Sequence, residues 1–351
     1  MTSRAVPGKE IAIRRLRAQH ISGTAFTRPA EAVAWLGAVQ AQDFSAALWA
    51  IGLRLTEGTA EDVERAIAER LIVRTWPMRG TLHFVAAADA RWMIELLAGR
   101  PAAAAANRLV SYGIDRGVLS RARRVLTRAL EGRRALTRTA IYSALEDAGI
   151  ATGHQRGLHI LWRLAQDCVI CFGPRDGKQP TFTLFDEWLP DARTLPREEA
   201  LARLADRYFR SHGPATVRDF AWWSGLQVSE AHRAVALAGE RLVEELHDGQ
   251  PFWSAEMGGG ALDVRGYLQI LPAFDEFLVG YTDRTAVLDA SRSGDVFRGG
   301  LIHPVVVHDG RVLGTWRRTM TRREVVCSVA PFVALGSRRS RLGHNRFCRC
   351  R

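Results

Sequence analysis

The sequence predicts an α+β protein in which one helical unit occurs three times and a region rich in β-strands follows. Three observations lead to this fold class. Amphipathic helices followed by a two-stranded hairpin recur between residues 8 and 261. Residues 262–333 then alternate apolar and polar side chains, as half-buried strands do. At 351 residues, the chain is long enough for two or three domains of ordinary size.

The first unit is expected at residues 8–95. Thr59 is a suitable N-cap for its third helix, and acidic side chains follow in the first turn of that helix. Arg79 and Gly80 stand where the two strands of its hairpin reverse direction. The expected elements are helices at 9–20, 29–39 and 59–70 and two strands within 71–85.

The second and third units are expected at residues 96–190 and 191–261. A turn at Gly177 separates the strands of the second unit, and Asp248-Gly249 forms a strong hairpin turn in the third. The second unit is expected to contain helices at 119–130, 136–149 and 155–167 and strands at 168–173 and 181–185. The third is expected to contain helices at 196–213, 215–225 and 227–239 and strands within 242–254.

Three helices with a two-stranded wing correspond to the winged variant of the helix-turn-helix, whose third helix can enter the major groove of DNA. A single copy found by pattern is weak support, whereas three copies in series are unlikely by chance. The third helices are assigned Arg156, Arg163 and Arg241. We therefore expect three tandem winged helices that present one concave basic surface to duplex DNA.

The end of the chain is expected to form a C-terminal β-rich region at 262–333 and a basic tail at 334–351. The strands are expected within 266–284, 302–319 and 324–332. Asp309 and Gly310, in "HDGR", form another tight turn. Beyond Phe332 the periodicity disappears, so the tail is expected to be solvated.

The charge of the chain favours polyanionic partners, nucleic acid before membrane. Its 49 basic and 37 acidic residues give a net charge of +12, and the pI is about 10.4. The last fifteen residues carry six arginines and no acid, so the rest of the chain has a charge of 12 − 6 = +6. The body of the protein is therefore only moderately basic.

No membrane span, secretion signal, metal or cofactor is expected. No run approaches 18 consecutive apolar residues, and the N-terminal segment lacks the apolar core of a signal peptide. Cys168 and Cys171 form a C-x-x-C pair without a second pair of ligands at zinc spacing. A cytoplasmic protein, associated with the nucleoid when bound to DNA, is the expectation.

Two glutamines close the segment "GAVQAQDFSAALWA" at residues 37–50. A helix usually ends in Gly, Asn or a basic residue, but Gln40 and Gln42 follow the predicted helix at 29–39. Taken alone, such glutamines are far more often capping or surface residues than catalysts. Asp43 is expected to be the N-cap of "FSAALWA", with a role as the reactive carboxylate as the alternative.

Several blocks carry a family resemblance. They are the Gln-Ala-Gln element, "RTWPMRGTLHFV", "HGPATVRDFAWWSGL", "LPAFDEFLVGYTDR" and "DGRVLGTWRRT". In this order they resemble the AlkZ-like DNA glycosylases, which are bacterial tandem winged-helix proteins. The resemblance covers residues 8–333 and stops after Phe332. The catalytic element of that family, a glutamine, an aliphatic residue and a glutamine or aspartate, maps onto Gln40, Ala41 and Gln42.

The resemblance implies a chemistry that amides can perform. An amide cannot act as a general base near neutral pH, but it can orient a water molecule through its carbonyl oxygen. It can also oppose a developing positive charge with its dipole. A purine alkylated at N7 or N3 is cationic, so its glycosidic bond is already weak. The expected function is a monofunctional DNA glycosylase for such purines, with bulky or crosslinking adducts left open.

Other polar residues are candidates for DNA contact. Arg79, Thr81 and His83 lie in the first wing, where His83 could contact phosphate or be structural. The hairpin at 305–319, with its turn at Asp309-Gly310, could approach the minor groove, as the resemblance implies, or only close the sheet. Its candidate arginines are Arg311, Arg317 and Arg318.

Two groups of residues are interpreted as structural. Asp275, Glu276 and Asp283 are expected in a strand and turn, with Arg284 neutralising one of them, and hydrolase catalysis by these acids is a minor alternative. The tryptophans expected in the core are Trp76, Trp222 and Trp223.

The alternative function is a non-enzymatic winged-helix DNA-binding protein or transcriptional regulator. Such a regulator needs no paired amides and usually dimerises on palindromic sites, yet no dimerisation zipper is visible. The expected partner is double-stranded DNA, bound by a monomer that has no obligate protein partner.

Overall fold

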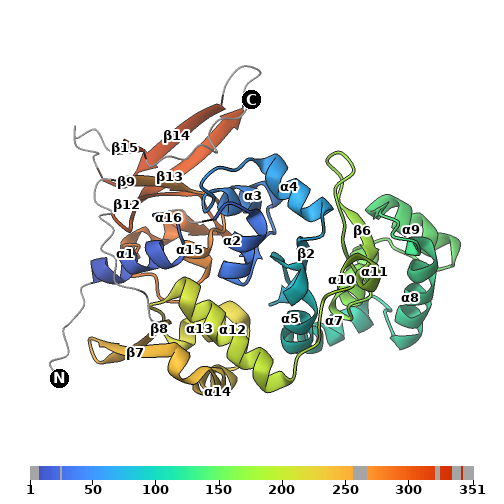
Figure 1. The fold of residues 1–351 in the computed structure, drawn as a ribbon. Helices are drawn as coiled ribbons and strands as arrows, with labels where there is room; N and C mark the ends of the chain where they lie inside the picture. The colour runs from blue at the N-terminus through green and yellow to red at the C-terminus, as the bar shows by residue number, and fades with distance from the viewer. Residues whose placement is uncertain (1–7, 24–25, 256–266, 321–324, 334–340, 343–351) are drawn as a thin grey trace. The chain divides into compact units, whose positions relative to one another are not determined.

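The computed structural model describes residues 8–23, 26–255, 267–320, 325–333 and 341–342 (Figure 1). It contains both helices and strands, which confirms the predicted α+β class. Its contacts define two compact units. We call the described residues up to 63 and from 201 onward the split unit, and residues 64–200 the inserted unit.

The helices of the split unit follow the predicted amphipathic segments closely. At the start of α13, Thr216 and Asp219 form a reciprocal capping box that satisfies backbone N–H groups of the first turn. The six longer helices are α1 (Gly8–Ala18), α2 (Pro29–Leu36), α3 (Phe44–Gly52), α12 (Arg197–His212), α13 (Val217–Ser224) and α14 (Val228–Ala238).

One of these helices is shorter than predicted. Helix α2 ends at Leu36, and Gly37 follows with φ +79°, a conformation that glycine adopts without strain. The next residues form the short strand β1 (Val39–Gln40). The glutamines therefore do not close a helix; they belong to the connection between α2 and α3.

A five-stranded sheet forms the C-terminal part of the split unit. Its strand order is β14-β13-β12-β9-β15. The β12–β13 hairpin is antiparallel and turns at Asp309-Gly310, as predicted. The strands are β9 (Tyr267–Leu271), β12 (Val305–His308), β13 (Arg311–Met320), β14 (Val325–Pro331) and β15 (Arg341–Leu342).

A separate hairpin of the split unit, β7 (Leu242–His247) with β8 (Gln250–Ala255), turns at Asp248-Gly249, also as predicted. Short elements complete the unit: α15 (Glu276–Val279), η2 (Gly239–Arg241), η3 (Ala290–Arg292), α16 (Ser293–Val296), β10 (Phe297–Arg298) and β11 (Leu301–Ile302).

The strand predicted within 266–284 is mostly absent. Strand β9 ends at Leu271, because Pro272 cannot donate a ladder hydrogen bond. Asp275 then caps the short helix α15, and its Oδ1 accepts from the N–H of Phe277 at 2.9 Å. Asp275 and Glu276 thus stand at the start of a helix, where carboxylates are favoured.

The inserted unit contains two hairpins and most of the remaining helices. The reversal at Arg79-Gly80 has φ values of 53° and 72°, as a two-residue turn of type I′ requires. A second sheet has the order β4-β6-β5. Its strands are β2 (Ile72–Met78), β3 (Thr81–Ala86), β4 (Leu136–Thr137), β5 (Ile170–Phe172) and β6 (Thr181–Leu184).

The helices of the inserted unit include three that the sequence reading missed. These three lie between residues 90 and 111, where the alanine-rich run "RPAAAAANRL" has high helix propensity. The helices are α5 (Ala90–Leu97), α6 (Gly99–Ala104), α7 (Ala106–Ser111), α8 (Arg116–Leu130), α9 (Arg138–Asp147), α10 (Arg156–Gln166) and α11 (Phe185–Trp188), with η1 (Ala87–Asp89) before α5. Two helices cross the boundary between the units: α4 (Ala60–Ala68), and α12, whose first four residues belong to the inserted unit.

Each unit has its own hydrophobic core. In the inserted unit, α8 and α10 contribute the leucines that their 3.6-residue spacing predicts, and Trp76 packs on Phe172. In the split unit, Trp49 of α3 packs on Trp316 of β13, with ring centroids 5.2 Å apart. This contact joins the segment that follows the glutamines to the sheet.

Most of the predicted basic tail at 334–351 lies outside the described residues, which include only 341–342 there. Within the part of the chain that the structure describes, no helix is both long and apolar enough to cross a membrane.

Candidate active site at Gln40 and Gln42

The connection between α2 and α3 is held tightly on both sides. A Cβ placed on Gly37 would lie 3.4 Å from Cη2 of Trp223 and 3.8 Å from Cβ of Arg207, so the end of α2 packs against α12 and α13. Asp43 accepts a hydrogen bond from the N–H of Ala46 at 3.0 Å and caps α3, as expected. This contact occupies the Asp43 carboxylate in a structural role.

The two glutamines have different environments. Gln40 is buried, with 9% of its surface exposed, whereas Gln42 is exposed. The side-chain Oε1 of Gln40 accepts from the backbone N–H of Gln42 at 3.1 Å. Gln40 therefore orders the backbone that carries Gln42, and Gln42 is the amide that presents itself to solvent.

A buried carboxylate lies directly beneath this element. Oε1 of Glu276 accepts from the backbone N–H of Gln40 at 2.9 Å, and Oε2 accepts from Nε1 of Trp223 at 3.0 Å. Glu276 and Trp223 are both fully buried. Because carboxylates are rarely buried without partners, these contacts account for the presence of Glu276 in the core.

His212 completes this buried group. Its Nε2 lies 3.5 Å from Oε2 of Glu276, its Nδ1 lies 2.8 Å from Oγ of Ser211, and its ring stacks on Tyr208. Burial lowers the pKa of His212 below its usual value, and the hydrogen bond to the Glu276 carboxylate opposes this only in part. The imidazole is therefore held neutral near pH 7.

Two arginines balance different acids of this region. Arg54 is fully buried beside Asp275 and neutralises it through two hydrogen bonds of 3.0 and 3.1 Å. Arg284 follows the end of α15 and donates to the backbone carbonyls of Leu278 and Thr282. Desolvation raises the pKa of Asp283, but hydrogen bonds from Thr285 and the charges of Arg15 and Arg284 lower it, in agreement with the expectation that Arg284 neutralises one of these acids.

The candidates in the first wing pack within the inserted unit. His83 has no exposed surface; its Nε2 lies 3.1 Å from Nη2 of Arg79 and its Nδ1 lies 3.0 Å from the carbonyl of Thr81. Both ring nitrogens are thus occupied by protein. This geometry favours the structural alternative for His83, while Arg79 and Thr81 are partly exposed at the turn.

The arginines assigned to the third helices bind protein groups. Arg156 begins α10 and donates to the carbonyls of Tyr112, Gly113 and Ala151, and Arg163 pairs with Asp167 at 2.8 Å. Arg241 does not lie on α14, contrary to the prediction. It follows that helix in η2 and donates to the carbonyls of Ala238 and Leu237, as basic residues commonly do at a helix C-terminus.

The predicted hairpin at 305–319 turns back onto the body of the split unit. A Cβ on Gly310 would lie 2.8 Å from Cβ of Ala12 in α1, and Lys9 forms an ion pair with Asp309. Arg311 donates to the carbonyls of Thr285 and Ala286. The Asp309-Gly310 turn therefore packs against α1, which favours the alternative in which the hairpin only closes the sheet.

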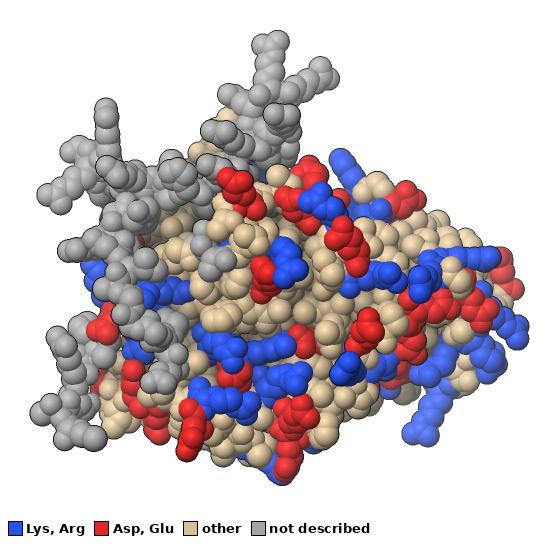
Figure 2. All heavy atoms as spheres, viewed as in Figure 1, with Lys and Arg blue, Asp and Glu red and all other residues tan. Residues whose placement is uncertain are grey.

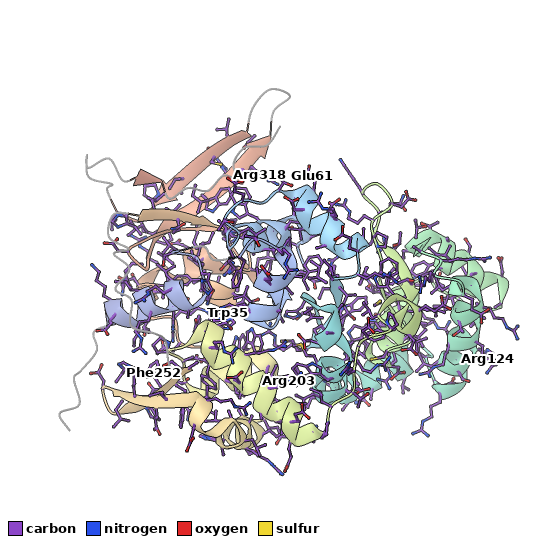
Figure 3. The ribbon with its side chains drawn as sticks, in the orientation of Figure 1. Trp35, Glu61, Arg124, Arg203, Phe252 and Arg318 are labelled. Carbon is purple, nitrogen blue, oxygen red and sulfur yellow. The ribbon has the colours of Figure 1, made fainter. Side chains whose placement is uncertain are left out.

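Arg317 and Arg318 lie further along β13 and are exposed. Arg318, labelled in Figure 3, extends over the ring of Trp49, and Arg317 lines a hollow of about 470 Å³ beside β13 and β14. Arg298, His303 and Asp295 also line this hollow, so its wall carries both basic and acidic side chains.

One tryptophan departs from the expectation of a core residue. Trp76 and Trp223 are buried, but 51% of the surface of Trp222 is exposed, although its Nε1 donates to the carbonyl of Val279. Residues 222 and 223 are adjacent on α13 and face different sides of it, so only one of them can point into the core.

A row of arginines on α12 was missed by the sequence reading. Arg203, Arg207 and Arg210 recur at a spacing of four and three residues, so they share one face of that helix. Basic side chains gather over α12 in Figure 2, and Arg203 is labelled there in Figure 3. The i, i+4, i+7 spacing was visible in "RLADRYFR" and could have identified this row.

The cysteine pair has no features of a reactive or metal-binding site. Cys168 and Cys171 are buried and free, and burial raises the pKa of the Cys168 thiol to about 12. Among the residues that the structure describes, no group of three or more His, Cys, Asp or Glu side chains is placed to hold a metal ion.

Comparison with known proteins decides the family. The family model described as DNA glycosylase AlkZ-like matches residues 33–345, which includes Gln40 and Gln42. The chain belongs to the AlkZ-like DNA glycosylase family. The predicted enzyme class, a DNA glycosylase, is thereby confirmed.

A protein sequence and a solved structure from Streptomyces sahachiroi both agree with the AlkZ-like assignment. A protein named interstrand DNA cross-link repair glycosylase is 28% identical over 340 residues, which cover 91% of this chain and 88% of that protein. The solved structure of the DNA glycosylase AlkZ superposes with a TM-score of 0.79 at 25% identity and covers 95% of this chain and 93% of its own. The AlkZ-like fold thus extends over nearly the whole chain.

Proposed function

We propose that this AlkZ-like chain excises purines that alkylation at N7 or N3 has made cationic, and that Gln40 and Gln42 carry the reaction. The observation that supports this most directly is the arrangement of the two amides. Gln42 is exposed, and its backbone is held by the buried side chain of Gln40. Such an element presents the side-chain amide of Gln42 to a substrate from a fixed backbone position.

The two amides are proposed to act on the attacking water and on the charge of the sugar. In the proposed reaction, the bond between C1′ and the base nitrogen breaks, and its electron pair leaves with the base, which becomes neutral. Gln42 orients a water molecule through its carbonyl oxygen, and the amide dipoles oppose the positive charge on the sugar. Water then adds to C1′ and releases a proton to solvent. An intact purine would leave as an anion, and neither amide can protonate it or deprotonate the attacking water, so it does not react.

Duplex DNA is the proposed partner, and a monomer is the proposed binding form. Each of the three predicted units contains helices followed by a hairpin, and we assign all three as winged helices. Arg203, Arg207 and Arg210 of α12 lie on the same unit as the glutamines, and Arg207 packs beside Gly37. Together with Arg317 and Arg318, they are proposed to contact phosphates near the reacting nucleotide.

Crosslinking adducts are the proposed extension of the substrate range. The relative from Streptomyces sahachiroi is named for interstrand cross-link repair, and the similarity spans 91% of this chain. An adduct at N7 that joins two strands carries the same cationic leaving group as N7-methylguanine. The same water attack would therefore release it.

The test is excision from duplex DNA that carries one N7-methylguanine, measured as abasic sites after alkaline cleavage. Changing Gln40 or Gln42 to Ala should slow excision roughly 10- to 1000-fold, the range for a lost positioning or electrostatic group. Gln42→Asp should retain activity, because a carboxylate can also hold water and oppose positive charge. DNA affinity should hardly change, since phosphate contacts carry most of it.

Asp43→Ala is the matched control. Asp43 stands next to Gln42 but caps α3, so its loss should weaken the helix by about 1 kcal/mol and leave the excision rate of the folded protein near normal. A rate that collapses in Asp43→Ala and persists in both glutamine variants would make Asp43 the catalyst. If the unaltered chain binds DNA tightly and excises no alkylated base, the regulator alternative prevails.

A further inference from the structure

The structure points to Glu276 as a positioning residue for the Gln-Ala-Gln element, an inference that rests on the proposed function of Gln40 and Gln42. Two successive hydrogen bonds connect Glu276 to the exposed Gln42. The carboxylate accepts from the backbone of Gln40, and the side chain of Gln40 accepts from the backbone of Gln42. The position of the Gln42 amide therefore depends on a residue 236 positions after Gln40.

The carboxylate is fixed in rotation as well as in place. Its two oxygens have different donors, Gln40 for Oε1 and Trp223 for Oε2, so turning the group would break one bond or both. The helix that carries it is fixed in turn, because the neighbouring Asp275 binds Arg54. All of these groups are buried, where an unmade hydrogen bond costs most.

The chemistry of the site requires a carboxylate rather than an amide. The backbone of Gln40 and the indole of Trp223 are both N–H donors, and a carboxylate offers one acceptor oxygen to each of them. Nε2 of His212 lies farther away, 3.5 Å from Oε2. A glutamine of the same shape would offer one carbonyl oxygen and one NH₂ group. Its NH₂ group would then face either the N–H of Gln40 or the N–H of Trp223, and two donors repel.

This donor conflict gives a specific test. Glu276→Gln should slow single-turnover excision of N7-methylguanine by roughly 10- to 100-fold, as expected when a reacting group is misplaced by about an ångström. Kd for the same duplex should stay within about twofold, because phosphate contacts carry most of the affinity. Trp223→Phe removes the second donor. In the double variant Glu276→Gln/Trp223→Phe, the glutamine can turn its oxygen to Gln40 without conflict, so the rate should recover relative to Glu276→Gln.

Asp219→Asn is the matched control. Asp219 is another fully buried carboxylate of the split unit, and it accepts from Thr216 and Thr282 without touching the glutamines. Asp219→Asn should lower the urea midpoint of unfolding, as we also expect for Glu276→Gln. It should leave the single-turnover rate of the folded protein unchanged. A merely structural role of Glu276 would give the same result for both variants.

The outcomes separate this inference from the proposed function. The positioning role is overturned if Glu276→Gln excises at the normal rate while Gln40→Ala and Gln42→Ala are slow. It is also overturned if the excision rate of the double variant is reduced by the product of the reductions in Glu276→Gln and Trp223→Phe. Normal rates in both glutamine variants overturn the proposed function itself. A slow Glu276→Gln that recovers on Trp223→Phe, beside slow glutamine variants, supports both.

Discussion

Arg54 and Asp275 form a buried, two-pronged ion pair: Nη1 lies 3.0 Å from Oδ2 and Nη2 lies 3.1 Å from Oδ1. The remaining N–H groups of Arg54 donate to the carbonyls of Ala50 and Gln19 and to the side chain of Gln19. All five guanidinium donors are therefore used. The pair joins the end of α3 to the start of α15, which carries Glu276.

We expect Arg54→Met to lower the free energy of unfolding by roughly 3–5 kcal/mol, because it leaves the Asp275 carboxylate buried without its cation. The measurement is urea denaturation followed by circular dichroism. Arg28→Met is the control, since Arg28 is 72% exposed and its ion pair with Glu31 lies in water. Equal losses in both variants would contradict the assignment of Arg54–Asp275 as the anchor of α15.

Stability should fall as the pH drops below about 6.5, and His212 should contribute to the fall. Burial lowers the pKa of His212 in the folded state, whereas in the unfolded chain it returns to about 6.5. Below that pH, His212 binds a proton in the unfolded state but not in the folded state. The free energy of unfolding then decreases by up to about 1.4 kcal/mol per pH unit for each such histidine, until the folded pKa is reached.

The check is the urea midpoint between pH 7.5 and 5.5 for the unaltered chain and for His212→Gln. Glu276 and Tyr208 contact His212, and the charge of Arg54 also acts on it; none of these residues is changed in this comparison. His20 and His159, whose pKa values are also lowered by burial, should leave a residual slope. An unchanged slope in His212→Gln would mean that this imidazole does not titrate with folding.

The elements that the sequence predicts well are those fixed by local rules. Turns such as Asp248-Gly249 and the cap at Asp43 depend on one or two residues, and they were found where the sequence placed them. The partners of buried charges were not predictable in this way. Arg54 and Asp275 are 221 residues apart, and nothing local in "IGLRLTE" indicates which acid Arg54 will meet.

For the candidate site, too, local features were predictable from the sequence and contacts between distant residues were not. The Gln-Ala-Gln element was visible as a short motif, whereas the burial of Gln40 and the exposure of Gln42 were not. The backbone of Gln40 is held by Glu276, which Trp223 binds in turn, and both residues come from distant segments. Arg241 was misplaced by a local error of three residues, because α14 ends at Ala238.

The arginine row on α12 should contribute to the salt dependence of DNA binding. For each phosphate that is no longer neutralised, the slope of log K against log salt should become shallower by about 0.9. We expect this change when Arg203, Arg207 or Arg210 is replaced by Ala, measured by fluorescence anisotropy on an undamaged duplex between about 50 and 200 mM salt. Arg241→Ala is the control, since its guanidinium donates to carbonyls at the end of α14. Slopes that are the same in all four variants would remove α12 from the DNA-binding surface.

Gly310 should be far less tolerant of substitution than Gly249, although both occupy the second position of a hairpin turn. Their φ values are +81° and +78°, so Ala at either site incurs the left-handed backbone strain of about 1–2 kcal/mol. At Gly249 nothing lies within 4 Å of the added Cβ, whereas at Gly310 it would meet Ala12 of α1 at 2.8 Å. Gly310→Ala should therefore lower the free energy of unfolding by clearly more than Gly249→Ala in urea titrations. The excision rate of the folded fraction should stay normal, because the Asp309-Gly310 turn faces α1. Equal stability of the two variants, or slow excision by well-folded Gly310→Ala, would restore the alternative in which this turn reaches toward DNA.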